Sequence, residues 1–450
     1  MGNNYLVLFC LIVVISCEYG VAGGNLGRRN FTQSVVSPTQ EPCYRCRFLI
    51  LQFVSAVCPR LRGAKINVDQ LDDIVASDPK IKNMLNNIDS MGGNAVFWMN
   101  LAERSKQAKV FIRCPQPVRN ADKPKLRFNT NGTFKIVNFA DLHYGEYQGL
   151  PLGKEQDNNS TRVMQTILRI ERPDFVVLTG DLITGEFVFY NPEFYLRKVF
   201  NTLEERGFRW ASTYGNHDNG FTSTRESIFA VESTFSNSYT QTDGTDDLAG
   251  LTNYYLLVYS SNATSNVTNE VETPVLIMWF FDSRGGFDMY GLKPANVDET
   301  VVNWFKVENA KMKKKWGIVP ALAFFHIPTR QYRAIQATIS IRSDCVGLVD
   351  EAVVTQDRET GLMDALVNSD TVMTTFVGHD HDNSWCCNHK KMQICYNRHS
   401  GYGGYGNWAR GARVVNLKEE DITHRLNYVR LENGTIIDAF PKGSESTFKL

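Results

Sequence analysis

Short runs of apolar residues alternate with stretches of helical apolar spacing through the middle of the chain. The runs Phe134–Ala140, Phe175–Thr179 and Leu322–Phe325 are almost continuously apolar, which is typical of buried strands. The stretches Ser160–Arg172 and Pro192–Arg206 place apolar residues three and four positions apart, which predicts amphipathic helices. An α/β fold is therefore expected for this part of the chain.

After Asn219 the pattern loosens into polar turns and then predicts a hairpin of Tyr254–Tyr259 with Val275–Phe281, followed by a helix at Asp298–Trp316. Shorter strands are predicted further on, at Thr371–Val377, Met392–Tyr396, Arg413–Leu417 and Arg425–Leu431. Two packed mixed sheets flanked by helices would accommodate this order of elements.

The amino-terminal part differs in pattern from the rest. Residues 1–22 hold a short apolar run followed by small residues, which predicts a cleaved secretory signal that is too short to span a membrane. Residues 43–115 have helical apolar spacing and predict a separate small helical module with cysteines near both ends. Prolines and charges in Gln116–Lys125 indicate a linker.

Composition fits an exported enzyme and argues against a nucleic-acid binder. The formal net charge is zero, so no overall field attracts a polyanion. Asn-x-Ser/Thr sequons begin at Asn30, Asn131, Asn158, Asn159, Asn262, Asn266 and Asn433. We therefore expect a secreted protein, or one of the lysosomal or vacuolar lumen.

Cysteine usage agrees with an oxidising compartment, because removing Cys10 and Cys17 with the signal leaves eight of the ten cysteines, an even number. Cys43-x-x-Cys46 could hold zinc, but the export context favours a structural bridge. The adjacent Cys386 and Cys387 are expected to have different partners. One would close a short loop with Cys395 and the other would reach Cys345.

Five short stretches carry residues that commonly bind metals, and most of them directly follow a predicted strand. They are Asp141-Leu-His143, Gly180-Asp181, Gly215-Asn216-His217-Asp218, His326 and Gly378-His379-Asp-His381. Ligands collect at the carboxyl ends of strands in α/β sheets, because loops there vary while the sheet holds their bases. Imidazole suits zinc and iron, and one carboxylate can bridge two ions about 3.5 to 4 Å apart. Asp181 is the candidate for that bridge.

The order of these stretches resembles the calcineurin-like metallophosphoesterase family, from about Phe134 to Val415. The resemblance implies a four-layer αββα sandwich over residues 128–441. It implies that Asp141, His143 and His381 hold one metal, that Asn216, His326 and His379 hold a second, and that Asp181 bridges them. His217 would then face the phosphoryl group, with Asp218 orienting its ring.

Within the family the chain is most similar to purple acid phosphatase-like proteins of the single-domain plant and fungal type, some of which are labelled inactive. The similarity is carried by Asn253-Tyr-Tyr255, Phe280-Phe-Asp282-Ser283, Gly291-Leu-Lys-Pro294, Phe324-Phe-His326-Ile-Pro328, and the segments Ile394–Tyr396 and Arg410–Val415. The purple enzymes carry a tyrosine three residues after the bridging aspartate, where it binds ferric iron. Here that position is Thr184. We therefore expect a colourless centre whose two metals are iron, zinc or manganese.

Three functions remain open at this stage. The first is hydrolysis of phosphate monoesters by attack of a metal-bridging hydroxide. The second is phosphodiester hydrolysis of the acid sphingomyelinase type, because residues 43–115 resemble a saposin-like module, although a disulfide-tied packing element is the alternative. That module would allow peripheral membrane contact. The third is a binding protein on the same scaffold, which the complete ligand set argues against. The substrate would be a phosphorylated small molecule, lipid or protein.

Overall fold

The computed structural model describes residues 123–220, 222–242, 248–262, 272–288, 291–424 and 426–442. The predicted signal at residues 1–22, the predicted module at 43–115 and the cysteines before residue 115 lie outside the described residues.

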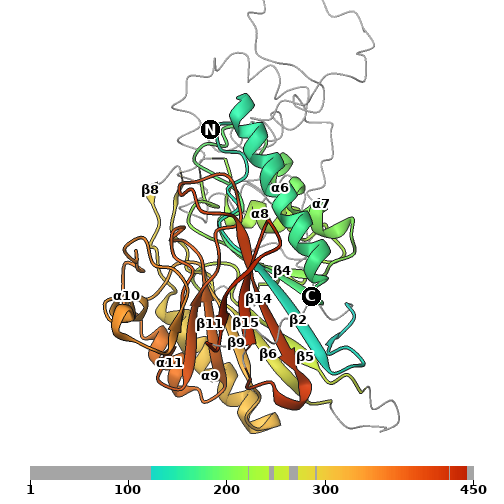
Figure 1. The fold of residues 1–450 in the computed structure, drawn as a ribbon, viewed down its shortest axis with the longest axis vertical. Coiled ribbons are helices and arrows are strands. Elements are labelled where there is room, and N and C mark those ends of the chain that lie inside the picture. The colour runs from blue at the N-terminus through green and yellow to red at the C-terminus, as the bar shows by residue number, and fades with distance from the viewer. Residues whose placement is uncertain are drawn as a thin grey trace, which may run out of the picture. The chain divides into compact units, whose positions relative to one another are not determined.

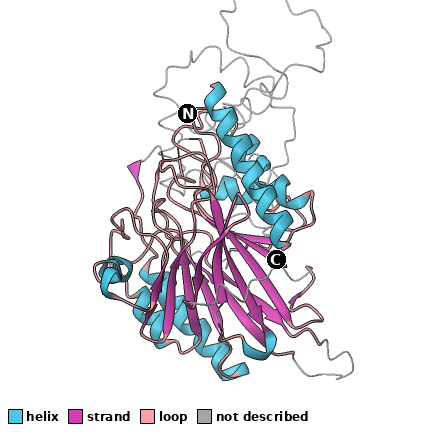
Figure 2. Cartoon of the chain, in the orientation of Figure 1, coloured by secondary structure: helices cyan, strands magenta, loops and turns pink. Residues whose placement is uncertain are grey.

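Two mixed β-sheets form the centre of the fold (Figures 1 and 2). The larger sheet has eight strands in the order β1-β5-β6-β9-β11-β13-β12-β10. Their bounds are β1 Leu126–Arg127, β5 Tyr254–Tyr259, β6 Pro274–Phe280, β9 Ala321–Phe324, β10 Cys345–Val346, β11 Val372–Val377, β12 Cys386–His389 and β13 Met392–Tyr396. Its strands β6, β9, β11 and β13 run parallel to one another.

The smaller sheet has six strands in the order β16-β15-β14-β2-β3-β4. Their bounds are β2 Thr133–Phe139, β3 Phe175–Thr179, β4 Trp210–Thr213, β14 Gly411–Lys418, β15 Leu426–Leu431 and β16 Ile436–Phe440. Strands β2, β3 and β4 are parallel, whereas β14 pairs antiparallel with both β2 and β15. A short hairpin of β7 Phe287–Asp288 and β8 Gly291–Leu292 stands apart from both sheets.

Helices cover the outer face of each sheet. Helices α6 Pro151–Glu171, α7 Pro192–Glu204 and α8 Arg225–Glu232 lie on the smaller sheet, and α9 Glu299–Trp316, α10 Arg330–Gln336 and α11 Leu362–Asn368 lie on the larger one (Figure 1). Two single-turn 3₁₀ helices, η3 Ile339–Ile341 and η4 Glu419–Asp421, complete the described elements.

Three apolar cores separate the four layers. One lies between the sheets and includes Phe134 and Phe175 of the smaller sheet with Phe324 of the larger. The other two lie between each sheet and its helices. Strands β3 and β9 are buried along their whole length, because both of their faces are covered, and their residues are almost continuously apolar instead of alternating. The predicted αββα sandwich is confirmed for the described residues.

Most predicted elements occur where the pattern placed them, with one clear difference. Helix α6 begins at Pro151, nine residues before the predicted start at Ser160. Its first turns are polar and carry no apolar stripe, but a proline at the first helical position has a suitable φ and needs no hydrogen-bond partner for its nitrogen. The short helices α8, α10 and α11 were not predicted, because one or two turns show too little periodicity.

The carboxyl-terminal disulfides join Cys345 to Cys387 and Cys386 to Cys395, as the spacing suggested. Successive residues of a strand point to opposite faces, so neighbours on β12 cannot share one partner region. Cys386 belongs to the core between the sheets and Cys387 to the core under the helices. Both bridges brace the strands that follow His381.

Candidate metal centre

All five ligand stretches lie at the carboxyl ends of strands. Asp141 follows β2, Asp181 follows β3, Asn216 follows β4, His326 follows β9 and His379 follows β11. The strands β2, β3 and β4 are parallel neighbours in one sheet, as are β9 and β11 in the other. The two sheets therefore deliver their ligands to one end of the sandwich.

The backbone is strained at four of these residues. Asp141, His143, Asp181 and His379 have positive φ angles of 56°, 49°, 52° and 81°. This region costs a non-glycine residue of order 1 kcal/mol or more, so it persists only where surrounding structure requires it. These four residues follow β2, β3 and β11, so the strained positions coincide with three of the strand ends that carry predicted ligands.

A first ligand group consists of Asp141, His143 and His381. One donor atom from each lies within 4.8 Å of the others, and all three residues are buried. The Nε2 atoms of His143 and His381 are 3.1 Å apart. Burial lowers the pKa of His143 well below its ordinary value and that of His381 to about 4, so both rings are neutral near pH 7. Neutral imidazole is the form that binds metals.

A second ligand group consists of Asp181, His326 and His379, whose donor atoms also lie within 4.8 Å of one another. Asn216 belongs to the same loop as His217, whose backbone nitrogen donates to Asp181 Oδ1 at 2.8 Å. Burial lowers the pKa of His379 to about 3. Burial also opposes protonation of His326, but the Asp181 and Asp141 carboxylates outweigh it and raise the pKa to about 9.

Asp181 lies between the two groups. Its Oδ2 is 2.9 Å from His326 Nε2 in the second group and 3.7 Å from His143 Nε2 in the first. Asp141 lies 3.9 Å from His326 Nε2, so the two groups adjoin. This is the position that a carboxylate shared by two cations requires. The ligand roles themselves stay predictions.

Three ligand atoms here are buried without a well-formed hydrogen bond. Asn216 Oδ1 has no hydrogen-bond partner, and Asp181 Oδ2 and His326 Nε2 lie 2.9 Å apart without hydrogen-bond geometry. A buried polar atom with no partner costs about 1–3 kcal/mol, and a cation would satisfy all three of these donors at once. The nitrogen and oxygen donors also suit iron, zinc or manganese. The residues therefore fit a dinuclear metal centre.

Hydrogen bonds to groups outside the two ligand groups determine which ring nitrogen of His326 and His381 faces the centre. His326 Nδ1 donates to the Thr179 carbonyl at 2.9 Å, and His381 Nδ1 donates to the Tyr405 carbonyl at 2.9 Å. Both therefore leave Nε2 free to coordinate. His143 Nδ1 contacts Thr184 Oγ1 at 3.0 Å. The residue that replaces the tyrosine of the purple enzymes thus orients a predicted ligand.

His217 borders the ligand groups but belongs to neither. Its ring centroid lies 5.0 Å from that of His143, and its Nδ1 forms a short hydrogen bond with Glu186 Oε1. Burial lowers the pKa of His217, but the carboxylates of Asp181 and Glu186 outweigh that effect and raise it to about 9. The geometry suits a protonated imidazole whose Nε2 is available to a ligand.

The prediction that Asp218 orients this ring is wrong. Asp218 Oδ1 accepts hydrogen bonds from the backbone nitrogens of Leu182 at 2.7 Å and Ile183 at 3.2 Å, and its Oδ2 accepts from Gly215 at 2.7 Å. The carboxylate therefore joins the loop that carries Asp181 to the loop that carries Asn216. Glu186 holds the ring instead, and no feature of the sequence distinguished it from a surface glutamate.

The glycine-rich segment Gly401–Gly406 lies against the first ligand group. A Cβ atom at Gly404 would lie only 2.4 Å from His381 Cε1, so only glycine fits. The Tyr405 ring stacks on His381 at 4.0 Å, and the buried His399 ring lies 3.9 Å from it. The glycine-rich segment thus lines one side of the first ligand group. The role of Tyr405 was missed because it depends on a contact 24 residues away in sequence.

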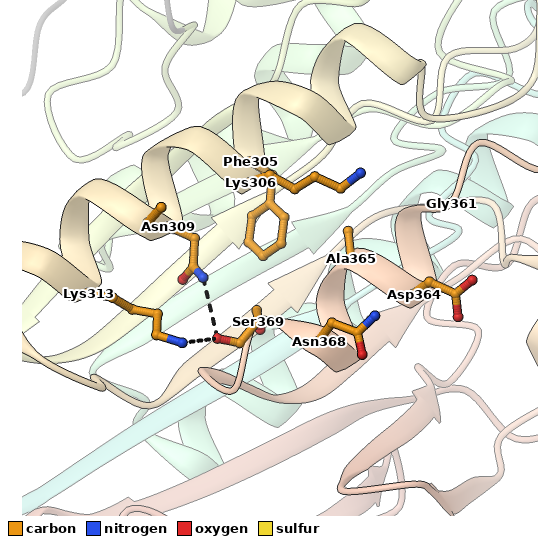
Figure 3. Close-up of a pocket in the computed structure, with 10 residues that line it drawn as sticks. Phe305, Lys306, Asn309, Lys313, Gly361, Asp364, Ala365, Asn368 and Ser369 are labelled. Atoms are coloured by element: carbon orange, nitrogen blue, oxygen red, sulfur yellow. Dashed lines mark hydrogen bonds between the residues drawn. The ribbon is translucent and has the colours of Figure 1, made fainter.

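A separate surface hollow of about 710 Å³ lies between α9 and α11 (Figure 3). Asn309 and Lys313 line it, and both donate to the Ser369 carbonyl. None of its lining residues belongs to the ligand groups. It is a junction between helices and not a part of the candidate centre.

Comparison with known proteins supports the same interpretation. The family model described as calcineurin-like phosphoesterase matches residues 134–383. Two Arabidopsis thaliana proteins, named "Probable inactive purple acid phosphatase 29" and "Probable inactive purple acid phosphatase 28", are each 30% identical to this chain. The first alignment covers 67% of this chain and 81% of the relative, and the second covers 65% and 77%.

A yeast relative carries a different name. "Phosphatase DCR2" of Saccharomyces cerevisiae is 29% identical over 66% of this chain and 54% of its own length. The chain is therefore similar both to a protein named a phosphatase and to proteins named inactive.

Among the described residues, none of the helices combines the length and apolar character needed to cross a bilayer.

Proposed function

This chain belongs to the calcineurin-like phosphoesterase family, and we propose that it is an active, exported phosphatase that hydrolyses phosphate monoesters. The observation that carries the proposal is the pair of adjoining ligand groups with Asp181 between them and His217 at their edge. The proposal goes beyond the names of the plant relatives, because every ligand position that the family resemblance implies is filled here.

The metal centre would be held by Asp141, His143 and His381 in one group, by Asn216, His326 and His379 in the other, and by Asp181 in both. When bound, two cations supply a hydroxide nucleophile near neutral pH and neutralise phosphate oxygens. The neutral state of His143, His379 and His381 keeps their nitrogens available without a competing proton.

His217 would act on the leaving oxygen. Its neighbours favour the protonated form, as they do for His326. Unlike His326, it belongs to neither ligand group, and its Nδ1 is held by a carboxylate outside those groups. A proton at Nε2 would then stabilise the charge that develops on the leaving group, or be transferred to it. Glu186 would keep the ring oriented and charged.

Export is supported by three features. The predicted signal at residues 1–22 and the seven sequons point to the secretory pathway, and the Cys345–Cys387 and Cys386–Cys395 bridges are typical of oxidising compartments. We therefore propose that the mature protein acts outside the cell or in a lysosomal or vacuolar lumen.

The test is hydrolysis of p-nitrophenyl phosphate by the secreted protein across acidic to neutral pH, with iron, zinc or manganese added. His217→Ala is the control variant, and bis(p-nitrophenyl) phosphate is the diester counterpart. We expect metal-dependent turnover of the monoester that falls sharply in the control. Turnover of the diester alone would replace the proposal with a diesterase, and a metal-loaded protein inactive on both would contradict it.

A further inference from the structure

Large apolar side chains gather at the surface on the two loops that follow β2 and β3 and on the first turns of the helices α6 and α7 after them. Of fifteen exposed large apolar residues in the described part of the chain, seven lie at positions 147–152 or 187–194. We define the apolar rim as Tyr147, Leu150, Phe187, Phe189 and Phe194, which are 46%, 57%, 47%, 63% and 50% exposed. Scattered apolar residues need no explanation, but a contiguous group of this kind marks a binding surface.

The two loops of the rim are built as one unit. Gln148 Oε1 accepts hydrogen bonds from the backbone nitrogens of Phe189 at 2.9 Å and Tyr190 at 3.2 Å, and Gln148 Nε2 donates to the Tyr190 carbonyl. At the base, Val188 packs so closely on Gly145 that a Cβ there would lie 2.5 Å from its Cγ2. The rim side chains therefore project from two loops whose backbones are held together by these contacts.

The rim is continuous with the candidate site. Phe187 directly follows Glu186, whose carboxylate holds the His217 ring. The Phe187 backbone nitrogen donates to the Thr184 carbonyl at 2.9 Å, and the Thr184 hydroxyl contacts His143. Gly185, two residues before Phe187, donates its backbone nitrogen to the His217 carbonyl at 2.8 Å, so the loop that carries Phe187 and Phe189 is joined to the segment of the imidazole that would face the leaving oxygen.

We propose that the apolar rim binds the hydrocarbon chain of the alcohol that leaves, so that the preferred substrates are phosphate monoesters of long-chain alcohols. The inference rests on the proposed function and names its substrate class. A small polar alcohol would leave Phe187 and Phe189 in water, whereas a chain extending from the leaving oxygen past His217 would cover them. Each methylene removed from water contributes up to about fourfold in kcat/KM.

The experiment compares butyl, hexyl and octyl phosphate, each below its micelle concentration, with the full secreted protein and added metal. We expect kcat/KM to rise at least tenfold from butyl to octyl phosphate. Replacing Leu150 and Phe189 together with serine should reduce this rise to threefold or less. Ile341→Ser is the matched control, because Ile341 is 85% exposed on η3 and outside the rim, so it should retain the full rise.

The outcomes of this experiment distinguish failure of the proposed substrate class from failure of the proposed phosphatase function. Turnover that is equal for all chain lengths would overturn the substrate class and leave the phosphatase function standing. If no ester is turned over, calorimetric titration with butyl- and octylphosphonate still tests the rim, and equal affinities would overturn it. Loss of binding to phosphatidylcholine vesicles in the Leu150 and Phe189 variant, with the chain-length dependence intact, would assign the rim to membrane docking and also overturn the proposal.

Discussion

Replacing Glu186 with glutamine tests whether this residue acts through His217. The Glu186 side chain is 20% exposed and that of His217 is 37% exposed, and they form a short hydrogen bond. Two unit charges about 4 Å apart attract by about 4 kcal/mol at an effective dielectric constant of about 20. Partial exposure screens the pair, so we expect the charge of Glu186 to contribute about 1–2 kcal/mol, or roughly 5- to 30-fold in rate.

The assay compares two leaving groups of similar size. Phenyl phosphate has a more basic leaving oxygen than p-nitrophenyl phosphate, so it depends more on a proton from His217. We expect Glu186→Gln to lower kcat by about 5- to 30-fold with phenyl phosphate and by clearly less with p-nitrophenyl phosphate. Metal content should not change, because Glu186 belongs to neither ligand group.

The matched control is Glu155→Gln, since Glu155 is an exposed carboxylate on α6. It should leave both rates within about twofold of the parent protein. Equal losses with both leaving groups would refute the reasoning, because they would show that Glu186 supports the loop and not the proton on His217. An unchanged kcat with phenyl phosphate would refute it as well.

Three further predictions concern the ligand groups and their support. Asp181→Ala should lower both metal content and turnover, because it removes the shared carboxylate; full metal occupancy by elemental analysis would contradict the assignment. Asp218→Asn should lower the free energy of unfolding by about 2–4 kcal/mol, because an amide cannot accept from all the backbone nitrogens that the carboxylate serves, and each buried donor left unpaired costs about 1–3 kcal/mol. Thermal unfolding checks this, and a variant with normal stability but low kcat would instead restore the idea that Asp218 serves His217. The buried imidazoles make the metal-free protein sensitive to acid. The pKa values of His379 and His381 fall from an ordinary 6.5 to about 3 and about 4, so the unfolded chain binds protons first and stability should decrease as the pH falls from about 6.5 towards 4. Denaturant unfolding at pH 7 and pH 4.5 after chelation measures it, and equal stabilities would show that these rings do not contribute.

Patterns that depend only on neighbouring residues could be predicted from the sequence. The runs before Asp141 and Asp181 are apolar because both faces of their strands are buried, and that local requirement is visible without the fold. The strand ends therefore located the ligand stretches. The different partners of Cys386 and Cys387 followed from the spacing of the carboxyl-terminal cysteines, and the alternation of side chains along a strand gives the physical reason.

Contacts between distant segments were decided only by the tertiary structure. Asp218 was assigned to His217 because the two are adjacent, yet the left-handed turn at Asp181 and the close approach of β3 and β4 present three backbone nitrogens to its carboxylate. Glu186 reaches His217 across 31 residues, a contact that has no sequence signal.

The same division explains the site as a whole. The sequence by itself determined which residue types stand at the strand ends, because strand burial and metal chemistry restrict them locally. Only the packing of two sheets brought Asp141 and Asp181 from one sheet together with His326 and His379 from the other, since the distances that define a metal centre arise between segments far apart in the chain. The apolar rim likewise depends on the tertiary structure, because Gln148 joins two loops that a whole helix separates in the chain.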